Sequence, residues 1–351
     1  MICSHMIIKQ NNNLKGLIIG CGSIGERHLH NLLSIGIKNM IIYDKDEFRV
    51  NQLSKKYNVK KSTDINSALS FEPNFTFICT YPDSHLKIAN QCLNANSHLF
   101  IEKPLASELN GVERILKQAE SKNLQIAVGY NMRFHKGLII LKEYLKRSAI
   151  SKPITIFAEW GNNIKQWRPG MNYTNHYVLK KGGGIILDAS HEYDYVRWLL
   201  DDEIKSVYCK TGKTTAIKTE TESNAVITLT FKKGAIANII LDYVRPQYER
   251  RCHIIGEKGD LKWEYKPKLQ SWKKYDSKAN AKVTLNLLNG KKLTKNFVSK
   301  TNEMYIDEAK SFINSIIHNK KPVVDGWDGL KTLKVGHAAL NSAKSNKPVM
   351  L

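Results

Sequence analysis

Short apolar runs separated by longer amphipathic stretches fill the first part of the chain. The runs that we predict to be strands are 17–19, 40–43, 75–79, 99–101 and 125–130. Between them lie segments long enough for helices, including a polar helix that follows Asp44 and ends at Tyr57. Strands that alternate with helices in this way form a parallel sheet covered on both faces. The pattern therefore predicts an α/β domain with a parallel sheet over residues 14–130.

The remainder of the chain has a different pattern, in which apolar and polar residues alternate as in half-buried strands. The alternating segments are 154–160, 225–231 and 235–243. The predicted helices are 137–145, a helix that starts at Asn302, and 330–343. We therefore expect a second α/β domain over 131–351. Residues 1–13 are expected to be a disordered lead-in.

A glycine-rich turn lies between the first predicted strand and the helix that follows it. Gly20 allows the tight turn out of the strand, Gly22 lets the backbone approach a pyrophosphate, and Gly25 lets the helix pack closely on the strand. Ser23 and Ile24 lie at the start of the helix, where free N–H groups and the helix dipole favour a phosphate. The motif and its context predict a dinucleotide-binding site.

An acidic residue at the end of the second strand makes the cofactor prediction more specific. Asp44 directly follows the apolar run 40–43. A carboxylate at this position accepts hydrogen bonds from both ribose hydroxyls and repels a 2'-phosphate. We therefore expect NAD as the cofactor and consider NADP less favoured, although Lys45 and Arg49 would tolerate a phosphate nearby.

The chain is strongly basic, with 54 lysines and arginines, 32 acidic residues and a formal charge of +22. Its lysine pairs are spread over the whole length, from 55–56 to 320–321, and form no basic tail. We therefore predict no nucleic-acid partner and assign Trp263 and Trp272 to packing on a sheet face. A basic surface would instead suit an anionic small-molecule substrate.

The six cysteines have neither a metal-ligand spacing nor a C-x-x-C pair. Such a distribution is typical of reduced thiols in a cytoplasmic protein, so we expect no metal site. The chain also has no apolar run that approaches the ~20 residues needed to span a bilayer, and no signal peptide. These features predict a cytoplasmic protein without a membrane partner.

Four residues follow predicted strands where those strands end. They are Asp44, Thr80, Lys103 and Tyr130. In open parallel sheets the ligand binds beyond the carboxyl ends of the strands. We therefore expect these four residues to lie along one edge of the sheet.

Several motifs occur together along the chain. They are the glycine turn, Thr80-x-Pro82 with His85, Glu102-Lys103-Pro104, and Gly182-Gly183-Gly184 followed by Asp188 and His191. In this combination the chain resembles the Gfo/Idh/MocA oxidoreductases over most of its length. The resemblance implies a Rossmann domain over 14–130 and a substrate-binding and oligomerisation domain over 131–351. The second domain would contain an open, mostly antiparallel sheet, through which a homo-oligomer, a dimer or tetramer, would form.

The resemblance also implies an NAD(P)-dependent reaction on sugars, cyclitols or related alcohols. The cofactor-binding residues that it adds to the glycine turn are Thr80, Pro82, His85, Glu102 and Lys103. It further implies a cis peptide bond between Lys103 and Pro104.

Hydride transfer from a carbinol carbon requires the hydroxyl proton to leave as well. Lys103 can stabilise the developing alkoxide, and His191 can take or return the proton near neutral pH. Asp188 can orient the imidazole or bind a neighbouring hydroxyl. By analogy with the family, Lys103 and His191 are the proton-handling pair.

Alternative roles stay open for these residues. Lys103 could be a surface lysine at a strand end, and His191 could pack a helix without touching a ligand. In the family the histidine usually follows the aspartate by four residues, whereas His191 follows Asp188 by three and Glu192 takes the fourth place. Which of His191 and Glu192 faces the substrate is therefore an open question.

Asn131, Arg168 and Tyr173 are the candidates for substrate binding. Arg168 could form a bidentate pair with a carboxylate or phosphate, or could stack on Trp167 or Tyr173 as a structural residue. The stretch 187–195 resembles the subgroup associated with surface-sugar biosynthesis. We therefore expect a sugar, a sugar acid or a nucleotide sugar as the substrate.

Two other functions fit the same scaffold. One is a reductase for a cyclic imine or a biliverdin-like substrate, which would need Lys103 and His191 less. The other is a non-catalytic NAD-binding sensor or regulatory protein. The presence of both Lys103 and His191 disfavours the sensor.

Overall fold

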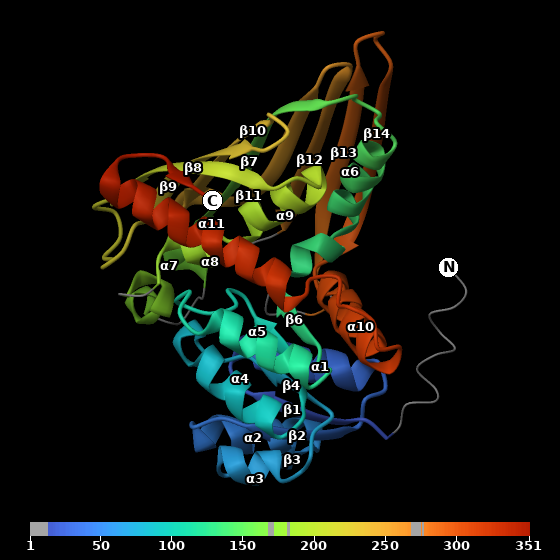
Figure 1. Ribbon diagram of the computed structural model, residues 1–351, viewed down its shortest axis with the longest axis vertical. Coiled ribbons are helices and arrows are strands. Elements are labelled where there is room, and N and C mark those ends of the chain that lie inside the picture. The colour runs from blue at the N-terminus through green and yellow to red at the C-terminus, as the bar shows by residue number, and fades with distance from the viewer. Residues whose placement is uncertain (1–12, 168–171, 181–182, 268–274, 276) are drawn as a thin grey trace. The chain divides into compact units, whose positions relative to one another are not determined.

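The computed structural model contains two compact units (Figure 1). The residues that it describes are 13–167, 172–180, 183–267, 275 and 277–351. Unit 1 comprises the chain up to Tyr130 together with Tyr305–Leu330. Unit 2 comprises Asn131–Met304 and Lys331–Leu351. The predicted lead-in, residues 1–13, lies outside the described residues except for Asn13.

Unit 1 is built around a six-stranded parallel sheet with the order β3-β2-β1-β4-β5-β6. Its strands are β1 (Lys15–Ile19), β2 (Asn39–Tyr43), β3 (Lys60–Lys61), β4 (Phe75–Ile78), β5 (His98–Glu102) and β6 (Ile126–Gly129). Its first helices are α1 (Ser23–Ser34), α2 (Glu47–Tyr57), α3 (Ile65–Leu69), α4 (His85–Asn94) and α5 (Val112–Ser121). The predicted parallel α/β fold is confirmed, and β4 is buried on both faces, as in sheets covered by helices on both sides.

A helix from the far end of the chain completes the core of unit 1. This helix is α10 (Glu303–Ile317), and its Phe312 ring packs edge-on against Phe75, Phe77 and Phe100, with centroids 5.6 to 6.3 Å apart. Backbone pairing adds to this packing, because Val128 N donates to Val324 O at 3.0 Å. Residues 305–330, which the sequence analysis assigned to the second domain, therefore belong to unit 1.

Unit 2 contains a nine-stranded sheet with the order β14-β13-β12-β11-β7-β10-β9-β8-β15. Its strands are β7 (Pro153–Asn163), β8 (Ile204–Gly212), β9 (Asn224–Phe231), β10 (Ile236–Asp242), β11 (Val244–Gly256), β12 (Gly259–Pro267), β13 (Lys278–Leu287), β14 (Lys292–Lys300) and β15 (Val349–Met350). All neighbouring pairs are antiparallel except β7 with β10. The predicted mostly antiparallel sheet is thus confirmed.

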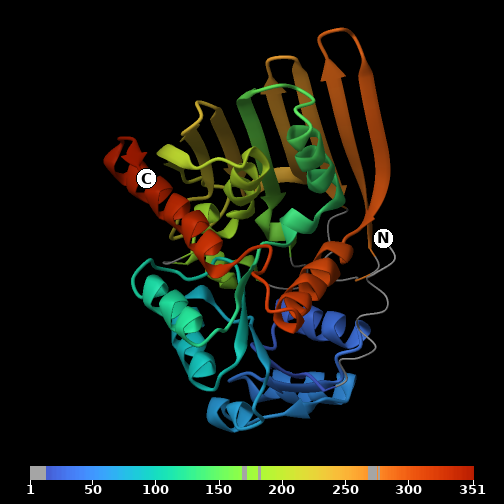
Figure 2. The ribbon, with the colours of Figure 1, turned by 45° about the vertical axis from the view of Figure 1, so that its right-hand side comes forward.

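Helices cover one face of the unit 2 sheet. They are α6 (Lys136–Lys146), α7 (Ile164–Trp167), α8 (Ile185–Asp188), α9 (His191–Leu200) and α11 (Gly326–Ser345), of which α11 starts in unit 1 and continues in unit 2. Figures 1 and 2 show α6 and α9 against this face. On the other face no helix among the described residues lies over the strands (Figure 2). The sheet is therefore open, as predicted.

Two strands of unit 2, β11 and β14, were not expected from the sequence. The first half of β11 carries arginines and other polar residues, and β14 is exposed at nearly every position as the edge strand. Lysines suit such an edge, because they discourage pairing with another chain. Neither strand has the apolar alternation on which the strand prediction depends.

No helix in the described part of the chain is both long and apolar enough to cross a membrane.

Candidate functional site

Two of the three glycines of the first turn, Gly20 and Gly25, occupy positions where a larger side chain would clash, and Gly22 borders open space. Gly20 has φ +99°, and a Cβ there would lie 2.7 Å from the carbonyl oxygen of Cys79. A Cβ on Gly25 would collide with the carbonyl oxygen of Gly20, so this glycine lets α1 lie directly against the turn. No atom lies within 4 Å of the Cβ position at Gly22, which leaves space where a pyrophosphate would approach.

Asp44 holds the same turn in place at the end of β2. Cys21 N donates to Asp44 Oδ2 at 2.6 Å, and Asp46 N donates to Oδ1 at 2.9 Å. A carboxylate offers about four acceptor sites, so each oxygen can also accept from a ribose hydroxyl. Ser23 and Ile24 open α1, where backbone N–H groups have no partner within the helix. These residues fit a bound NAD.

Arg49, one of the two basic residues near Asp44, is already paired with a carboxylate. Arg49 Nε lies 3.0 Å from Asp46 Oδ2, so its charge is paired within the first turn of α2. Asp46 also caps that helix by accepting from Arg49 N. The local charge therefore favours NAD over NADP.

Replacement of Asp44 with serine should lower NAD affinity about a hundredfold or more and reduce the preference for NAD over NADP. Each lost hydrogen bond to the charged carboxylate is worth about 1.5–3 kcal/mol, and the repulsion of a 2'-phosphate disappears. Titration of tryptophan fluorescence with NAD and with NADP would measure both affinities. The exposed variant Asp83→Ser is the control, and an unchanged ratio of the two affinities would contradict the role of Asp44.

His85 lies between two turns of unit 1. Its ring is fully buried, with Nε2 3.1 Å from Thr80 O and Nδ1 3.1 Å from Pro104 O. Burial lowers the pKa of this imidazole. Pro82 opens the 3-10 turn η2 (Pro82–Ser84) that precedes His85. His85 therefore connects the end of β4 to the turn after β5, and we assign it to positioning these turns.

The turn after β5 contains the candidate catalytic lysine. Lys103 is half-buried, and its peptide bond to Pro104 is cis, as the resemblance implied. The side chain of Glu102 is turned inward, where Oε1 lies 2.7 Å from His28 Nε2 and Oε2 accepts from Lys103 N at 3.1 Å. The buried Glu102 carboxylate therefore links the turn at Lys103 to His28.

In unit 2 the triple-glycine turn leads into α8. Gly184 has φ +106°, and a Cβ there would collide with the carboxylate of Glu222. Glu222 Oε1 accepts from Ile186 N at 3.2 Å, which satisfies a free N–H group at the start of α8. Burial raises the pKa of Glu222. Sequence reasoning missed Glu222, because a lone glutamate far along the chain carries no local signal.

Asp188 ends α8 and is held by a tyrosine from the neighbouring sheet. Tyr243 OH donates to Asp188 Oδ2 at 3.0 Å, and both side chains are buried. Burial and the Asp188 charge raise the pKa of Tyr243 well above its usual value. Because Tyr243 stays protonated, it is a permanent donor to Asp188.

His191 and Glu192, at the start of α9, differ in how far they are buried. His191 is half-buried, whereas Glu192 is fully buried with Oε1 2.7 Å from Arg250 Nε. The carboxylate of Glu192 is therefore committed to an ion pair inside unit 2. This leaves His191 as the better candidate for contact with a substrate.

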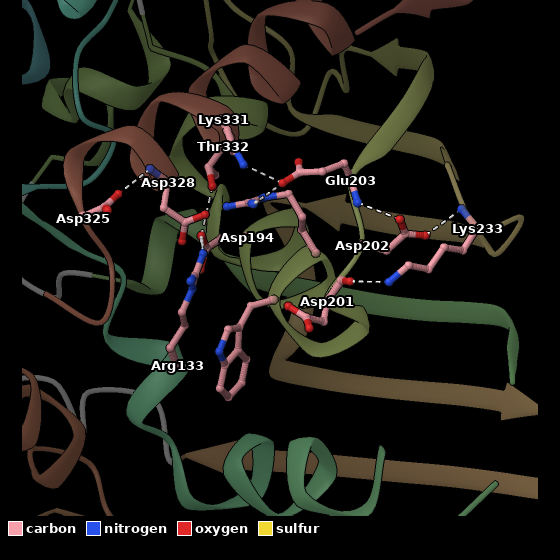
Figure 3. A network of polar contacts seen from close by, with 12 residues as sticks. Arg133, Asp194, Asp201, Asp202, Glu203, Lys233, Asp325, Asp328, Lys331 and Thr332 are labelled. Carbon is pink, nitrogen blue, oxygen red and sulfur yellow. Dashed lines mark hydrogen bonds and ion pairs between the residues drawn. The ribbon is translucent and has the colours of Figure 1, made fainter. Parts of the chain in front are cut away.

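A buried ion pair holds α9 in its orientation (Figure 3). Arg133 donates to Asp194 through Nε at 2.9 Å and through Nη2 at 2.6 Å. Thr332 Oγ1, on α11, donates to Asp194 Oδ1 at 3.0 Å. Since Asp194 follows His191 by three residues on the same helix, these contacts fix the start of α9 as well.

The candidate substrate residues lie in different surroundings. Asn131 is buried in the turn after β6. Tyr173 OH accepts from Lys218 N at 3.2 Å, and Lys165 Nζ lies 5.7 Å from the centre of its ring. Arg168 lies outside the described residues. Within the same segment His176 stacks on Trp167 with ring centroids 5.4 Å apart.

The fold and the glycine turn define a two-domain, dinucleotide-binding protein of the Rossmann class. Residues 14–130 match the family model "Oxidoreductase family, NAD-binding Rossmann fold", and residues 156–351 match "Oxidoreductase family, C-terminal alpha/beta domain". The chain therefore belongs to the Gfo/Idh/MocA family of NAD-dependent oxidoreductases.

Curated relatives and solved structures cover nearly the whole chain. A myo-inositol 2-dehydrogenase from Thermotoga maritima is 27% identical over 95% of this chain and 97% of its own. An inositol 2-dehydrogenase/D-chiro-inositol 3-dehydrogenase from Lacticaseibacillus casei is 26% identical over 95% and 93%. The crystal structure of myo-inositol 2-dehydrogenase from Lactobacillus plantarum has a TM-score of 0.78 at 23% identity, covering 96% and 99%, and shares the fold.

Proposed function

We propose that this oxidoreductase interconverts a secondary alcohol and a ketone on a cyclic polyol, with NAD as the hydride carrier. The observation that carries the proposal is the hydrogen bond that Tyr243 donates to Asp188. Asp188 precedes His191 by three residues in the chain. The hydrogen bond holds the Asp188 carboxylate in place, where it can bind or orient polar groups close in the chain to the His191 imidazole. The relatives named as inositol dehydrogenases support this substrate class.

Each candidate residue has a defined role in this proposal. NAD, when bound by the glycine turn and Asp44, supplies the acceptor or donor for the hydride. Lys103 donates a hydrogen bond to the reacting oxygen and stabilises its developing negative charge. His191 removes or returns the hydroxyl proton, and Asp188 orients the imidazole or a neighbouring hydroxyl.

The substrate is a ring with several hydroxyls, which includes cyclitols and the sugars, sugar acids and nucleotide sugars expected from the sequence. An anionic member would match the net charge of +22. The surface-sugar subgroup stays a prediction. A reduced compartment such as the cytoplasm fits the five described cysteines, which are free and buried.

A substrate panel tests the function and its alternatives. Inositols, neutral sugars, uronic acids, nucleotide sugars and a cyclic imine would be incubated with NAD or NADP, and absorbance at the reduced-nicotinamide band would be followed. Turnover of a polyol or sugar supports the proposal. Turnover of the imine alone would identify an imine reductase, whereas NAD binding without any turnover would favour a sensor.

Replacement of Tyr243 with phenylalanine should lower kcat/KM for the polyol about tenfold. The variant removes the hydroxyl that donates to the buried Asp188 carboxylate, a bond worth about 1.5–3 kcal/mol. Steady-state kinetics at saturating NAD would measure the loss. Tyr208→Phe is the matched control, since its hydroxyl bonds to Asn346. Equal kinetics in the two variants would argue against a role for Tyr243.

We also propose a homo-oligomer, a dimer or tetramer, that forms through the uncovered face of the unit 2 sheet. Large apolar side chains on this face are partly exposed, with Phe157, Val226 and Ile236 at 39%, 45% and 44%. Such exposure on a sheet face is typical of an association surface.

The double variant Val226→Arg/Ile236→Arg should therefore shift the protein to a smaller species, because it places like charges across a self-association surface. Size-exclusion chromatography with light scattering measures the mass. Leu288→Arg, at a site with 80% exposure, is the control. A monomeric native protein, or an unchanged mass in the double variant, would contradict the proposed surface.

A further inference from the structure

A histidine from α1 and a glutamate from the end of β5 form a pair inside unit 1. His28 Nε2 lies 2.7 Å from Glu102 Oε1. The imidazole is fully buried, and its ring centroid lies 5.0 Å from the rings of both Phe77 and Phe100. His28 Nδ1 is buried and has no hydrogen-bond partner among the described residues. The geometry therefore favours the tautomer in which Nε2–H donates to Glu102.

The second oxygen of Glu102 is used by the candidate catalytic turn. Glu102 Oε2 accepts from the backbone N–H of Lys103 at 3.1 Å. On its other side the carboxylate lies over Gly129 of β6, where a Cβ would be 3.1 Å from Glu102 Oε2. The carboxylate is thus confined from three directions, and one of its contacts is the residue proposed to act on the substrate.

The histidine comes from the helix that also forms the cofactor turn. His28 follows Gly25 by three residues on α1, whose first turn faces the predicted pyrophosphate site. The neighbouring Arg27 lies with its guanidinium 4.7 Å from the centre of the Tyr305 ring. Because a helix is rigid over one turn, a contact made by His28 has a fixed position relative to the glycine turn.

We propose that His28 and Glu102 are positioning residues that hold Lys103 in a fixed relation to the cofactor turn. The proposal rests on the proposed function, in which Lys103 acts on the reacting oxygen. A buried histidine–carboxylate pair is costly to desolvate. If the two residues only filled space in the core, apolar side chains would do so without this cost. The pair instead links the helix of the cofactor turn to the backbone of Lys103.

Glu102 also contributes negative charge near Lys103. The groups that share this electrostatic environment are His28 and Arg27 from α1, Cys79 after β4, His85 from α4, and Tyr305 and Glu308 from α10. Burial is the main cause that raises the pKa of Tyr305; Glu102 raises this pKa further and Lys103 lowers it, so both charges are felt at the Tyr305 hydroxyl. Loss of the carboxylate that accepts from Lys103 N should therefore hold the turn less firmly and make the Lys103 amine more accessible to a reagent.

The test uses the full chain with bound NAD and the variants Glu102→Gln, His28→Gln and His28→Leu. Competitive acetylation of Lys103 with acetic anhydride at pH 8, read by mass spectrometry, reports the reactivity of the amine without any substrate. In Glu102→Gln the acetylation rate at pH 8 should rise about threefold. His30→Gln, on the same helix, is the matched control and should leave the rate unchanged.

Kinetics with the substrate that the panel identifies complete the test. His28→Leu should lower kcat about tenfold while the Kd for NAD stays within twofold, and His28→Gln, which keeps a donor, should recover most of the loss. Unchanged acetylation in Glu102→Gln, or a native kcat in folded His28→Leu, would overturn the proposal. If His28→Leu fails to fold, acetylation in Glu102→Gln and kcat in His28→Gln still test the proposal. If the native protein turns over nothing, the proposed function fails, while acetylation still tests the pair.

Discussion

Replacement of Lys103 with alanine is expected to lower kcat/KM roughly a thousandfold while NAD binding changes less than twofold. The ammonium is proposed to stabilise charge that develops on the reacting oxygen, and removal of such a group typically costs a factor of about 10²–10⁴. The residue is half-buried in the turn after β5. Steady-state kinetics and a separate titration with NAD would measure the two effects.

The exposed variant Lys38→Ala is the control for loss of one positive charge in unit 1. Lys103→Arg should recover little activity, because a guanidinium differs from an ammonium in shape and does not readily give up its proton. A Lys103→Ala protein with native turnover would exclude Lys103 from the reaction and would revive the sensor or imine-reductase alternatives.

Replacement of Asp194 with alanine is expected to lower the free energy of unfolding by about 3–5 kcal/mol. The substitution leaves the guanidinium of Arg133 buried without its carboxylate, and loss of one partner of a buried ion pair has this magnitude. Urea denaturation followed by circular dichroism would measure the change.

A double variant separates the charge effect from a simple loss of packing. Arg133→Met combined with Asp194→Leu removes both charges, so it should be less destabilised than the sum of the two single variants. Additive losses would show that the pair has no coupling energy. Because Asp194 also fixes α9, activity at a temperature where Asp194→Ala remains folded should fall as well.

Local motifs made much of unit 1 predictable. Gly20, Gly22 and Gly25 each have a backbone requirement that can be read from neighbouring residues, and Asp44 follows directly from the end of a strand. The packing of α10 was not predictable, because Phe312 meets Phe75 and Phe77 across more than half of the chain. No periodic pattern reports which of two cores an amphipathic helix will join.

In unit 2 the same limit applies to side-chain partners. The sequence identified Asp188 and His191 as candidates but left open whether Glu192 would face the substrate. The ion pair of Glu192 with Arg250 decides its orientation, and it joins residues from α9 and β11 that lie far apart in the chain. Tyr243 likewise belongs to a predicted strand, yet its hydrogen bond to Asp188 required the folded structure.

The contribution of α10 to unit 1 affects how the protein could be recombined. A fragment that ends at Tyr130 would carry the whole parallel sheet but would lack Phe312, which leaves the rings of Phe75, Phe77 and Phe100 without their cover. Exposed aromatic surface of this kind promotes aggregation. The first 130 residues therefore cannot be transplanted alone, and a chimera between relatives would have to exchange α10 together with them.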